Sequence, residues 1–257
     1  MNKKLYILSI LTLLIFNNGF SQKKASEKPD IKKNVIGISA TYAYQIPGGD
    51  LANRFGDNSS IGGAVWFKHK TNWIIGAEFT YSFGQNMKEE AYSIFDNIKT
   101  SDGNITDKYG QASVILLSER GFYAGVKLGR VIPISKRNLN SGILLTFGLG
   151  ILQHKIDIQN DGNVTPQIVG DYEKGYDKLT NGLALQQFVG YMYVGKSRLA
   201  NFYAGMEFTQ AFTQSRRDFD FTLMRKDDTK RLDLLSSIRV GWVIPFYKRE
   251  AKDFYYN

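Results

Sequence analysis

Five charged residues lie inside largely apolar stretches of the chain, where an unpaired charge would be costly. They are Glu78, Lys127, Glu207, Asp233 and Arg239. Buried carboxylates and cations are tolerated when each has a partner of opposite sign. Such pairs either lock a packed interior or line a path for small ions. The residues therefore indicate an interior polar layer, and its use depends on the elements that carry it.

A second set of residues has the chemistry of a hydrolase. His154 could act as a general base, with Asp157 and Ser215 as its possible companions. Asp157 and Ser215 could lie within range of His154, but nothing in the sequence fixes them there, so a lipid-modifying enzyme is the least favoured function. The chain has 2 His and no Cys, which argues against a transition-metal site. We expect no catalytic residues, no metal and no cofactor.

The elements that must position these residues are strands, because eight segments alternate apolar with polar residues. In RLDLLSSIRVGWVIPFY, at 231–247, one alternate set is almost wholly apolar, whereas the other contains Asp233 and Arg239. These strands are longer than the usual length of about five or six residues. They are expected at 35–46, 60–70, 72–84, 121–134, 141–158, 180–195, 201–214 and 231–247.

Short and long connections alternate strictly between these strands. The short ones are KHKTN, SKRNLN and GKSRLAN, and the long ones cover 47–59, 85–120, 159–179 and 215–230. This layout is typical of an outer-membrane barrel with tight periplasmic turns and long outer loops. The predicted fold is all-β, an eight-stranded antiparallel up-and-down transmembrane β-barrel. Ser113–Glu119 is placed in the second long loop, with a ninth strand or an extension of the fourth as alternatives.

In such a barrel the apolar set faces lipid, and the other set faces a narrow lumen filled by side chains. Glu78, Lys127, Glu207 and Arg239 all lie about six to eight residues from a short turn. The third and fourth strands are neighbours, as are the seventh and eighth. We therefore expect a Glu78–Lys127 pair and a Glu207–Arg239 pair, forming a packed polar core rather than an ion gate.

The N-terminus reads MNKKLYILSILTLLIFNNGFSQKK, which has a basic start, a short apolar run and small residues before a cut. This pattern predicts a secretory signal peptide, because the run is too short to span a membrane comfortably. The expected organisation is a signal peptide at 1–21, a periplasmic tether at 22–34, the barrel at 35–247 and a C-terminal tail at 248–257. Both termini of the mature chain would be periplasmic.

The leader, the eight strands and the alternating loops resemble the small outer-membrane barrels typified by OmpA and OmpX. The leader ending FSQ and the last strand GWVIPFY, followed by a short tail, look like barrels of Bacteroidota. The resemblance covers about residues 35–247 and is architectural; it implies an interior ion-pair plug. Such barrels usually end on a C-terminal aromatic residue, whereas here KREAKDFYYN follows the last strand. The fold hosts adhesins, scaffolds, lipid enzymes and secretion accessories.

The two ends of the barrel differ in charge. The formal net charge is +9, and the excess lies in the tether, the tail and the short turns. A basic periplasmic rim could face anionic headgroups or an acidic partner, or could simply be solvated. Nucleic acid is not expected as a partner of an exported barrel. The basic residues near the short turns are Lys68, Lys70, Arg130, Lys136, Arg137, Lys196 and Arg198.

Two long loops carry candidate contact residues. The third contains GDYEKGYDKLTNG, whose Tyr and Gly residues suit protein recognition, although the loop could equally pack on itself. Basic residues in the fourth could bind lipopolysaccharide phosphates. The candidates for the partner contact are Tyr172, Lys174, Tyr176 and Asp177, and those for lipopolysaccharide are Arg216, Arg217, Arg225 and Lys226.

The function favoured by this pattern is a non-enzymatic outer-membrane barrel that acts through its rims. It would be a scaffold or accessory component of an envelope assembly, with protein secretion suggested by analogy. Its partners would be outer-membrane lipid, lipopolysaccharide and an envelope protein whose identity the sequence does not give. The alternatives are a small pore or hydrophobic-solute channel and, less favoured, a lipid-modifying enzyme.

Overall fold

The computed structural model describes residues 32–89, 91–195 and 199–247. The predicted signal peptide, most of the tether and the C-terminal tail lie outside the described residues, as do Lys196 and Arg198. Among the residues that are described, no helix is long and apolar enough to cross a membrane.

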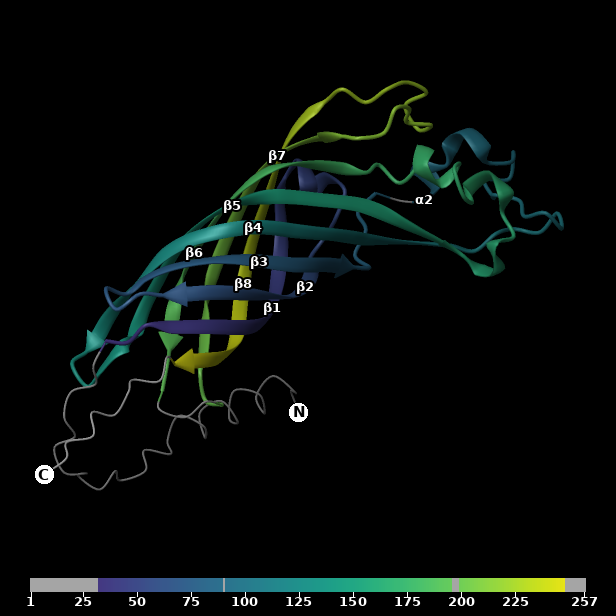
Figure 1. Cartoon of the computed structure of the whole chain (residues 1–257). Coiled ribbons are helices and arrows are strands. Elements are labelled where there is room, and N and C mark those ends of the chain that lie inside the picture. The colour runs from purple at the N-terminus through teal and green to yellow at the C-terminus, as the bar shows by residue number, and fades with distance from the viewer. Residues whose placement is uncertain (1–31, 90, 196–198, 248–257) are drawn as a thin grey trace, which may run out of the picture.

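Eight antiparallel strands close into a barrel in which each strand pairs with its sequence neighbours and β1 pairs with β8 (Figure 1). The predicted all-β, eight-stranded up-and-down barrel is confirmed. Closure leaves no open sheet edge around the ring, so the backbone groups of all eight strands find partners. The strands are β1 (Val35–Gly49), β2 (Asn58–Lys68), β3 (Trp73–Gly84), β4 (Ile115–Ser135), β5 (Asn138–Asn160), β6 (Thr180–Tyr193), β7 (Phe202–Ser215) and β8 (Lys230–Tyr247).

The connections give the barrel two different ends. The short-turn end holds the connections 69–72, 136–137 and 194–201, and the long-loop end holds 50–57, 85–114, 161–179 and 216–229. The predicted alternation of short and long connections is therefore present. The long loops carry the one α-helix of the described residues, α2 (Ala91–Ile94), and five 3-10 turns, η1 (Asp50–Asn53), η2 (Asp96–Ile98), η3 (Asp161–Asn163), η4 (Pro166–Ile168) and η5 (Glu173–Gly175).

Strands β4 and β5 remain paired beyond the ends of their neighbours and reach the helices of the long-loop end (Figure 1). β3 ends where Gly84 pairs with Glu119, but β4 continues to Ile115, which pairs with Asn160. The placement of Ser113–Glu119 in the second loop was therefore wrong for most of that segment, which extends the fourth strand. Sequence alternation did not reveal the extension because Leu116 and Leu117 are consecutive apolar residues.

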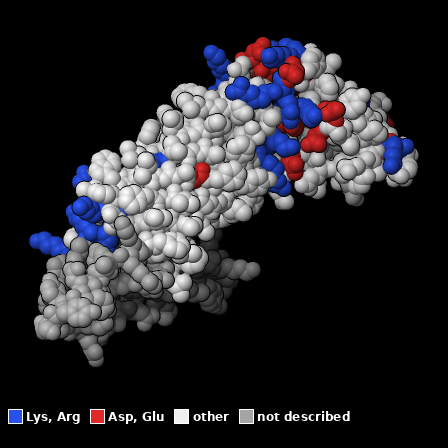
Figure 2. All heavy atoms as spheres, in the orientation of Figure 1, with Lys and Arg blue, Asp and Glu red and all other residues white. Residues whose placement is uncertain are grey.

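Alternate side chains point outward and form an apolar belt, as the pattern of β1 illustrates with its strict alternation of buried and exposed residues. Aromatic residues collect at both edges of this belt. Figure 2 shows that Lys, Arg, Asp and Glu gather toward the ends of the molecule and leave a largely uncharged surface between them. The outward aromatic residues are Tyr42, Tyr44, Tyr81 and Phe212 toward the long-loop end, Phe67, Trp73, Tyr193, Phe202, Trp242 and Phe246 toward the short-turn end, and Phe79, Phe147, Tyr191 and Phe208 between these two sets.

The inward side chains fill the barrel in layers. An apolar cluster near the short-turn end includes Trp66, Phe188, Met192 and Tyr203. Buried polar residues occupy the middle. A second apolar cluster, centred on Phe55, Ile94, Phe95 and Tyr176, joins the upper interior to the long loops. We call the loops packed on this second cluster the cap.

Candidate functional site

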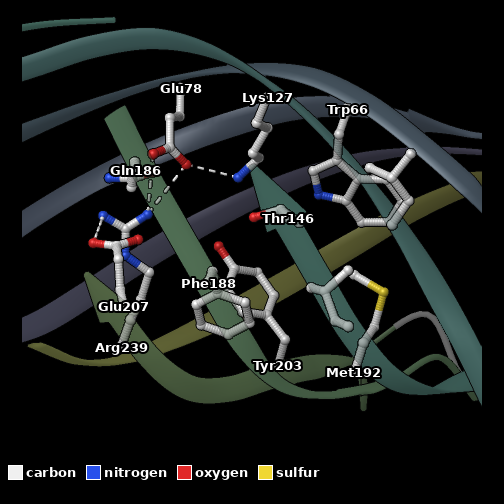
Figure 3. Close-up of a pocket in the computed structure, with 12 residues that line it drawn as sticks. Trp66, Glu78, Lys127, Thr146, Gln186, Phe188, Met192, Tyr203, Glu207 and Arg239 are labelled. Atoms are coloured by element: carbon white, nitrogen blue, oxygen red, sulfur yellow. Dashed lines mark hydrogen bonds and ion pairs between the residues drawn. The ribbon is translucent and has the colours of Figure 1, made fainter. Parts of the chain in front are cut away.

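A network of two carboxylates and two cations crosses the middle of the barrel (Figure 3). Lys127 Nζ lies 2.7 Å from Glu78 Oε2, and Arg239 Nη2 lies 2.8 Å from Glu207 Oε1. These are the two pairs expected from strand parity. Arg239 Nη1 also lies 3.1 Å from Glu78 Oε2, so the two pairs form one continuous network.

Barrel closure creates the third contact of this network. Glu78 lies on β3 and Arg239 on β8, and these strands are not neighbours in the sheet. Their side chains meet across the lumen, where the Arg239 and Glu207 side chains are only 3% and 1% exposed. Buried Arg239 lies between two carboxylates and can offset only one of their charges. Lys127, which pairs with Glu78, supplies the second positive charge. The layer therefore carries two positive and two negative groups, as a buried network requires.

The network and the apolar cluster beneath it leave little internal space. Both line a cavity of about 20 Å³, bounded among others by Trp66, Phe188, Tyr203 and Met192 (Figure 3). A cavity of this size holds about one water molecule. Phe188 and Tyr203 pack edge to face with ring centroids 5.6 Å apart. The middle of the barrel is thus filled by its own side chains, as expected for eight strands.

A second buried polar group lies nearer the long-loop end. His154 Nε2 is 2.9 Å from Asp233 Oδ2, and the Thr213 hydroxyl donates a hydrogen bond to the same carboxylate oxygen. The ring of Phe55 packs edge-on against the His154 imidazole at 5.6 Å. Asp233 thus faces the lumen as predicted, but its partner is His154 on β5, which the sequence pattern did not connect to it.

The enzyme arrangement that the sequence raised is not formed. Asp157 instead accepts a hydrogen bond from Ser118 and lies 3.8 Å from Arg120 Nε. His154 is 3% exposed and covered by Phe55, so a lipid substrate has no access to its imidazole. In the described part of the chain, no group of three or more His, Asp or Glu residues is arranged to hold a metal ion.

The cap is stabilised by ion pairs between loops. Arg217 of the fourth loop binds Asp177 of the third through two nitrogen atoms, with Nε at 2.8 Å from Oδ1. The hydrogen bonds that the Arg217 guanidinium donates to Asp177 raise the pKa of Arg217 above its ordinary value. Lys178 of the third loop pairs with Glu89 of the second. Glu89 also lies 3.6 Å from Arg54 of the first loop, so the four long loops form one packed structure rather than independent arms.

This packing corrects half of the predicted partner loop. Tyr176 and Asp177 are 4% and 1% exposed, because Tyr176 packs against Phe95 and Phe221 and Asp177 binds Arg217. Both side chains mainly hold the cap together, and little of either is exposed. Tyr172 and Lys174 remain on the surface, and Lys174 pairs with Asp171 at 2.6 Å. The tyrosine spacing had no sign that separated the buried ring from the exposed one.

An uncharged groove opens on the cap between the second, third and fourth loops. Its volume is about 550 Å³, and none of its lining residues carries a charge. Charged pairs lie next to it in the sequence, Asp96 with Lys99 and Asp171 with Lys174. An apolar hollow rimmed by polar groups is typical of a recognition surface. The lining residues are Asn97, Ile98, Pro166, Gln167, Tyr172, Tyr176, Phe221 and Met224.

The basic residues of the fourth loop have separate environments. Arg217 is occupied by Asp177, which removes it as a lipopolysaccharide contact, and Lys226 lies 3.9 Å from Asp228. Arg225 and Arg216 are exposed, and Arg216 Nε donates to the Asn181 side chain. Arg231, at the start of β8, is bound to Asp227.

Asp227 anchors the fourth loop. Burial of Asp227 disfavours its charged form, but the hydrogen bonds from Arg231 and Thr229 outweigh burial and hold the pKa of this carboxyl below its ordinary value. Its backbone neighbour Asp228 is largely exposed. Asp227 therefore stabilises the closed loop while it is ionised.

The short-turn end is basic, with one correction. Lys68 is the last residue of β2 and is fully buried, with Nζ 3.0 Å from Asn140 Oδ1, so it is not a rim charge. Lys70, Arg130, Lys136 and Arg137 are exposed. The described residues of the short connections contain no Asp or Glu. Among the described residues of these connections the charge is therefore positive only, and on the face that Figure 2 shows the coloured residues at this end are Lys and Arg.

No family model and no curated protein matches this sequence. Several solved structures match, among them the following three. Surface protein A of Neisseria is 10% identical with a TM-score of 0.43, covering 82% of this chain and 97% of that one. Ail, the attachment invasion locus protein of Yersinia pestis, is 10% identical with a TM-score of 0.41, covering 82% and 99%. The outer membrane protein OprG of Pseudomonas aeruginosa is 10% identical with a TM-score of 0.40, covering 85% and 100%.

Proposed function

We propose that this protein is an integral outer-membrane barrel with its long-loop end outside the cell and its short-turn end in the periplasm. The apolar belt with aromatic residues at both edges supports a membrane position, since Trp and Tyr favour the two lipid–water interfaces. Loop length supports the orientation, because outer-membrane barrels have short periplasmic turns and longer external loops. The basic short-turn end would then face the inner leaflet.

Within that membrane, the protein acts as a non-enzymatic scaffold or accessory component of an envelope assembly, such as a protein-secretion complex. The observation that carries this proposal is the closed interior. An ion network, an apolar layer and a packed cap lie in series along the barrel, and the cavity at the ion network holds only about 20 Å³. A barrel filled in this way has its accessible chemistry at its two ends.

The uncharged groove of the cap is the contact we assign to the partner. Its occupant is a protein segment that inserts an apolar or aromatic side chain, because the lining offers Tyr, Phe, Met, Ile and Pro without any charge. Aromatic and Met residues are enriched where proteins meet. Tyr172 and Met224 are both more than half exposed at this groove and would be covered on binding.

A crosslinking experiment tests the partner contact. A photo-reactive amino acid replaces Tyr172 in the groove or, as a control, Tyr109, which is at least as exposed on the second loop but does not line the groove. In native membranes the Tyr172 position should give one defined protein adduct that the Tyr109 position does not give. The same adduct from both positions, or none from Tyr172, would contradict the assigned contact.

A conductance measurement separates this proposal from the pore. Wild-type protein in planar bilayers should give no stable single-channel currents, because the ion network and the apolar cluster block the lumen. Large, steady currents would replace the scaffold by a channel. Turnover of phospholipid or lipopolysaccharide that is lost in His154→Ala would replace it by an enzyme.

A further inference from the structure

A cleft on the outer wall of the barrel lies where β7 and β8 enter the long-loop end. Its volume is about 540 Å³. Phe212 and Leu232 form its apolar part, and Arg216 and Lys230 are among the charged residues that line it. The cap groove is lined by different residues, so the cleft is a separate surface.

The cleft places positive charge directly above the apolar belt. Phe212 pairs with Leu232, and both side chains are exposed on the outer face. Two residues further along, Gln214 pairs with Lys230 on the same face. Two residues of a strand span about 7 Å. A cation at this height can reach a lipid headgroup while its stem lies along the acyl region.

The two outward cations of the cleft are not neutralised by carboxylates of the described chain. Arg231, which also lines the cleft, is held by Asp227. Arg216 has no ion pair among the described residues; its Nε is fixed by the Asn181 side chain, which orients the guanidinium. Lys230 has none there either. Lys88, Lys108 and Arg225 of the long-loop end also have no ion pair among the described residues, but of these unpaired cations only Arg216 and Lys230 line the cleft.

We propose that this cleft binds a phosphorylated glycolipid of the outer leaflet, with a phosphate between Arg216 and Lys230 and an acyl chain against Phe212 and Leu232. Arginine and lysine form strong charge-assisted hydrogen bonds with phosphate oxygens. Asn181, Gln214 and Asp50, which complete the polar lining, suit sugar hydroxyls. The inference rests on the membrane position proposed above, but it does not depend on the scaffold role.

The cleft contains only part of the basic set near the fourth loop. Of the four candidate lipopolysaccharide contacts Arg216 alone lines the cleft, where it is joined by Lys230, the first residue of β8. Arg225 and Lys226 are exposed in the same loop but lie outside the cleft lining. They supply a matched control, because removing them lowers the charge of the loop by the same amount.

Native mass spectrometry of the folded full-length protein in detergent micelles tests the site, with diphosphorylated lipid A as the probe. The variant Arg216→Gln with Lys230→Gln should raise the Kd by about tenfold or more, since it removes two charge-assisted contacts. The control Arg225→Gln with Lys226→Gln should stay within about twofold of wild type. Detergent gel electrophoresis checks folding: a folded variant should migrate more slowly after boiling than before it.

The remaining arms decide between sources of binding. Dephosphorylated lipid A should bind the wild-type protein as weakly as lipid A binds the cleft variant. Adding Phe212→Ala to the cleft variant should weaken lipid A binding again. Equal losses in the cleft and control variants would mean general charge attraction and overturn the site. If inorganic phosphate displaced lipid A at the same concentration as the lipid, the cleft would be a site for phosphate alone, and the glycolipid would be overturned as its ligand. If the protein did not bind lipid A but also gave no current in planar bilayers, the glycolipid site would be wrong while the scaffold proposal would stand, because the two measurements are independent.

Discussion

Replacing Arg239 by Met is the perturbation that most directly probes the closed interior. Arg239 is 2% exposed and bridges Glu207 at 2.8 Å and Glu78 at 3.1 Å. In the variant, Glu78 keeps Lys127, but Glu207 loses its cation and the layer gains one net negative charge. Removing one partner of a buried ion pair costs about 3–5 kcal/mol. We expect the free energy of unfolding to fall by that amount.

Two further variants test whether the uncompensated charge causes the loss of stability in Arg239→Met. Arg239→Met with Glu207→Gln restores a neutral layer, so it should cost less than Arg239→Met alone. Lys127→Met leaves Glu78 its contact with Arg239, and the Lys127 side chain is 10% exposed, so it should also cost less. Urea unfolding in lipid vesicles, followed by tryptophan fluorescence, measures the three values.

The reasoning would be refuted by a double variant that is as unstable as Arg239→Met. That result would mean that lost packing of the long arginine stem, rather than the uncompensated Glu207 carboxylate, sets the cost. A loss below about 1 kcal/mol for Arg239→Met would mean that the network contributes no more than an exposed pair does.

Three other predictions concern the cap and the barrel wall. Because Asp227 has a pKa below its ordinary value, its stabilisation of the fourth loop is complete above about pH 4 and is lost as the pH falls through the folded pKa. Pepsin should therefore cleave the wild-type loop 216–229 faster as the pH falls below that value. In Asp227→Asn the susceptibility of the loop should not change with pH in this way. Tyr176→Ala should lower the stability of the cap by about 3 kcal/mol and expose the loops to protease, while the heat-dependent gel shift of the barrel stays intact. Gly37→Ala would place a Cβ 2.2 Å from the Trp66 ring and should destabilise the barrel by about 1–3 kcal/mol, whereas Gly48→Ala, whose nearest contact is 3.4 Å, should be close to neutral in the same urea assay.

The strand count, the two faces and two of the ion pairs could be predicted from the sequence. Alternation has a period of two, so it can be read along one strand without knowing any other. Counting residues from a tight turn gives the register between sequence neighbours, which suffices for Glu78 with Lys127 and for Glu207 with Arg239. These properties are local, and tertiary structure had only to preserve them.

Only the tertiary structure decided the contacts across the lumen and within the cap. Glu78 meets Arg239 and His154 meets Asp233 because closure brings non-adjacent strands together, and no pattern along one strand encodes that approach. The loops have no period, so burial of Tyr176 and exposure of Tyr172 depend on packing between segments distant in the sequence. Packing between the loops likewise pairs Arg217 with Asp177, whereas Arg216 and Lys230 line the outer cleft.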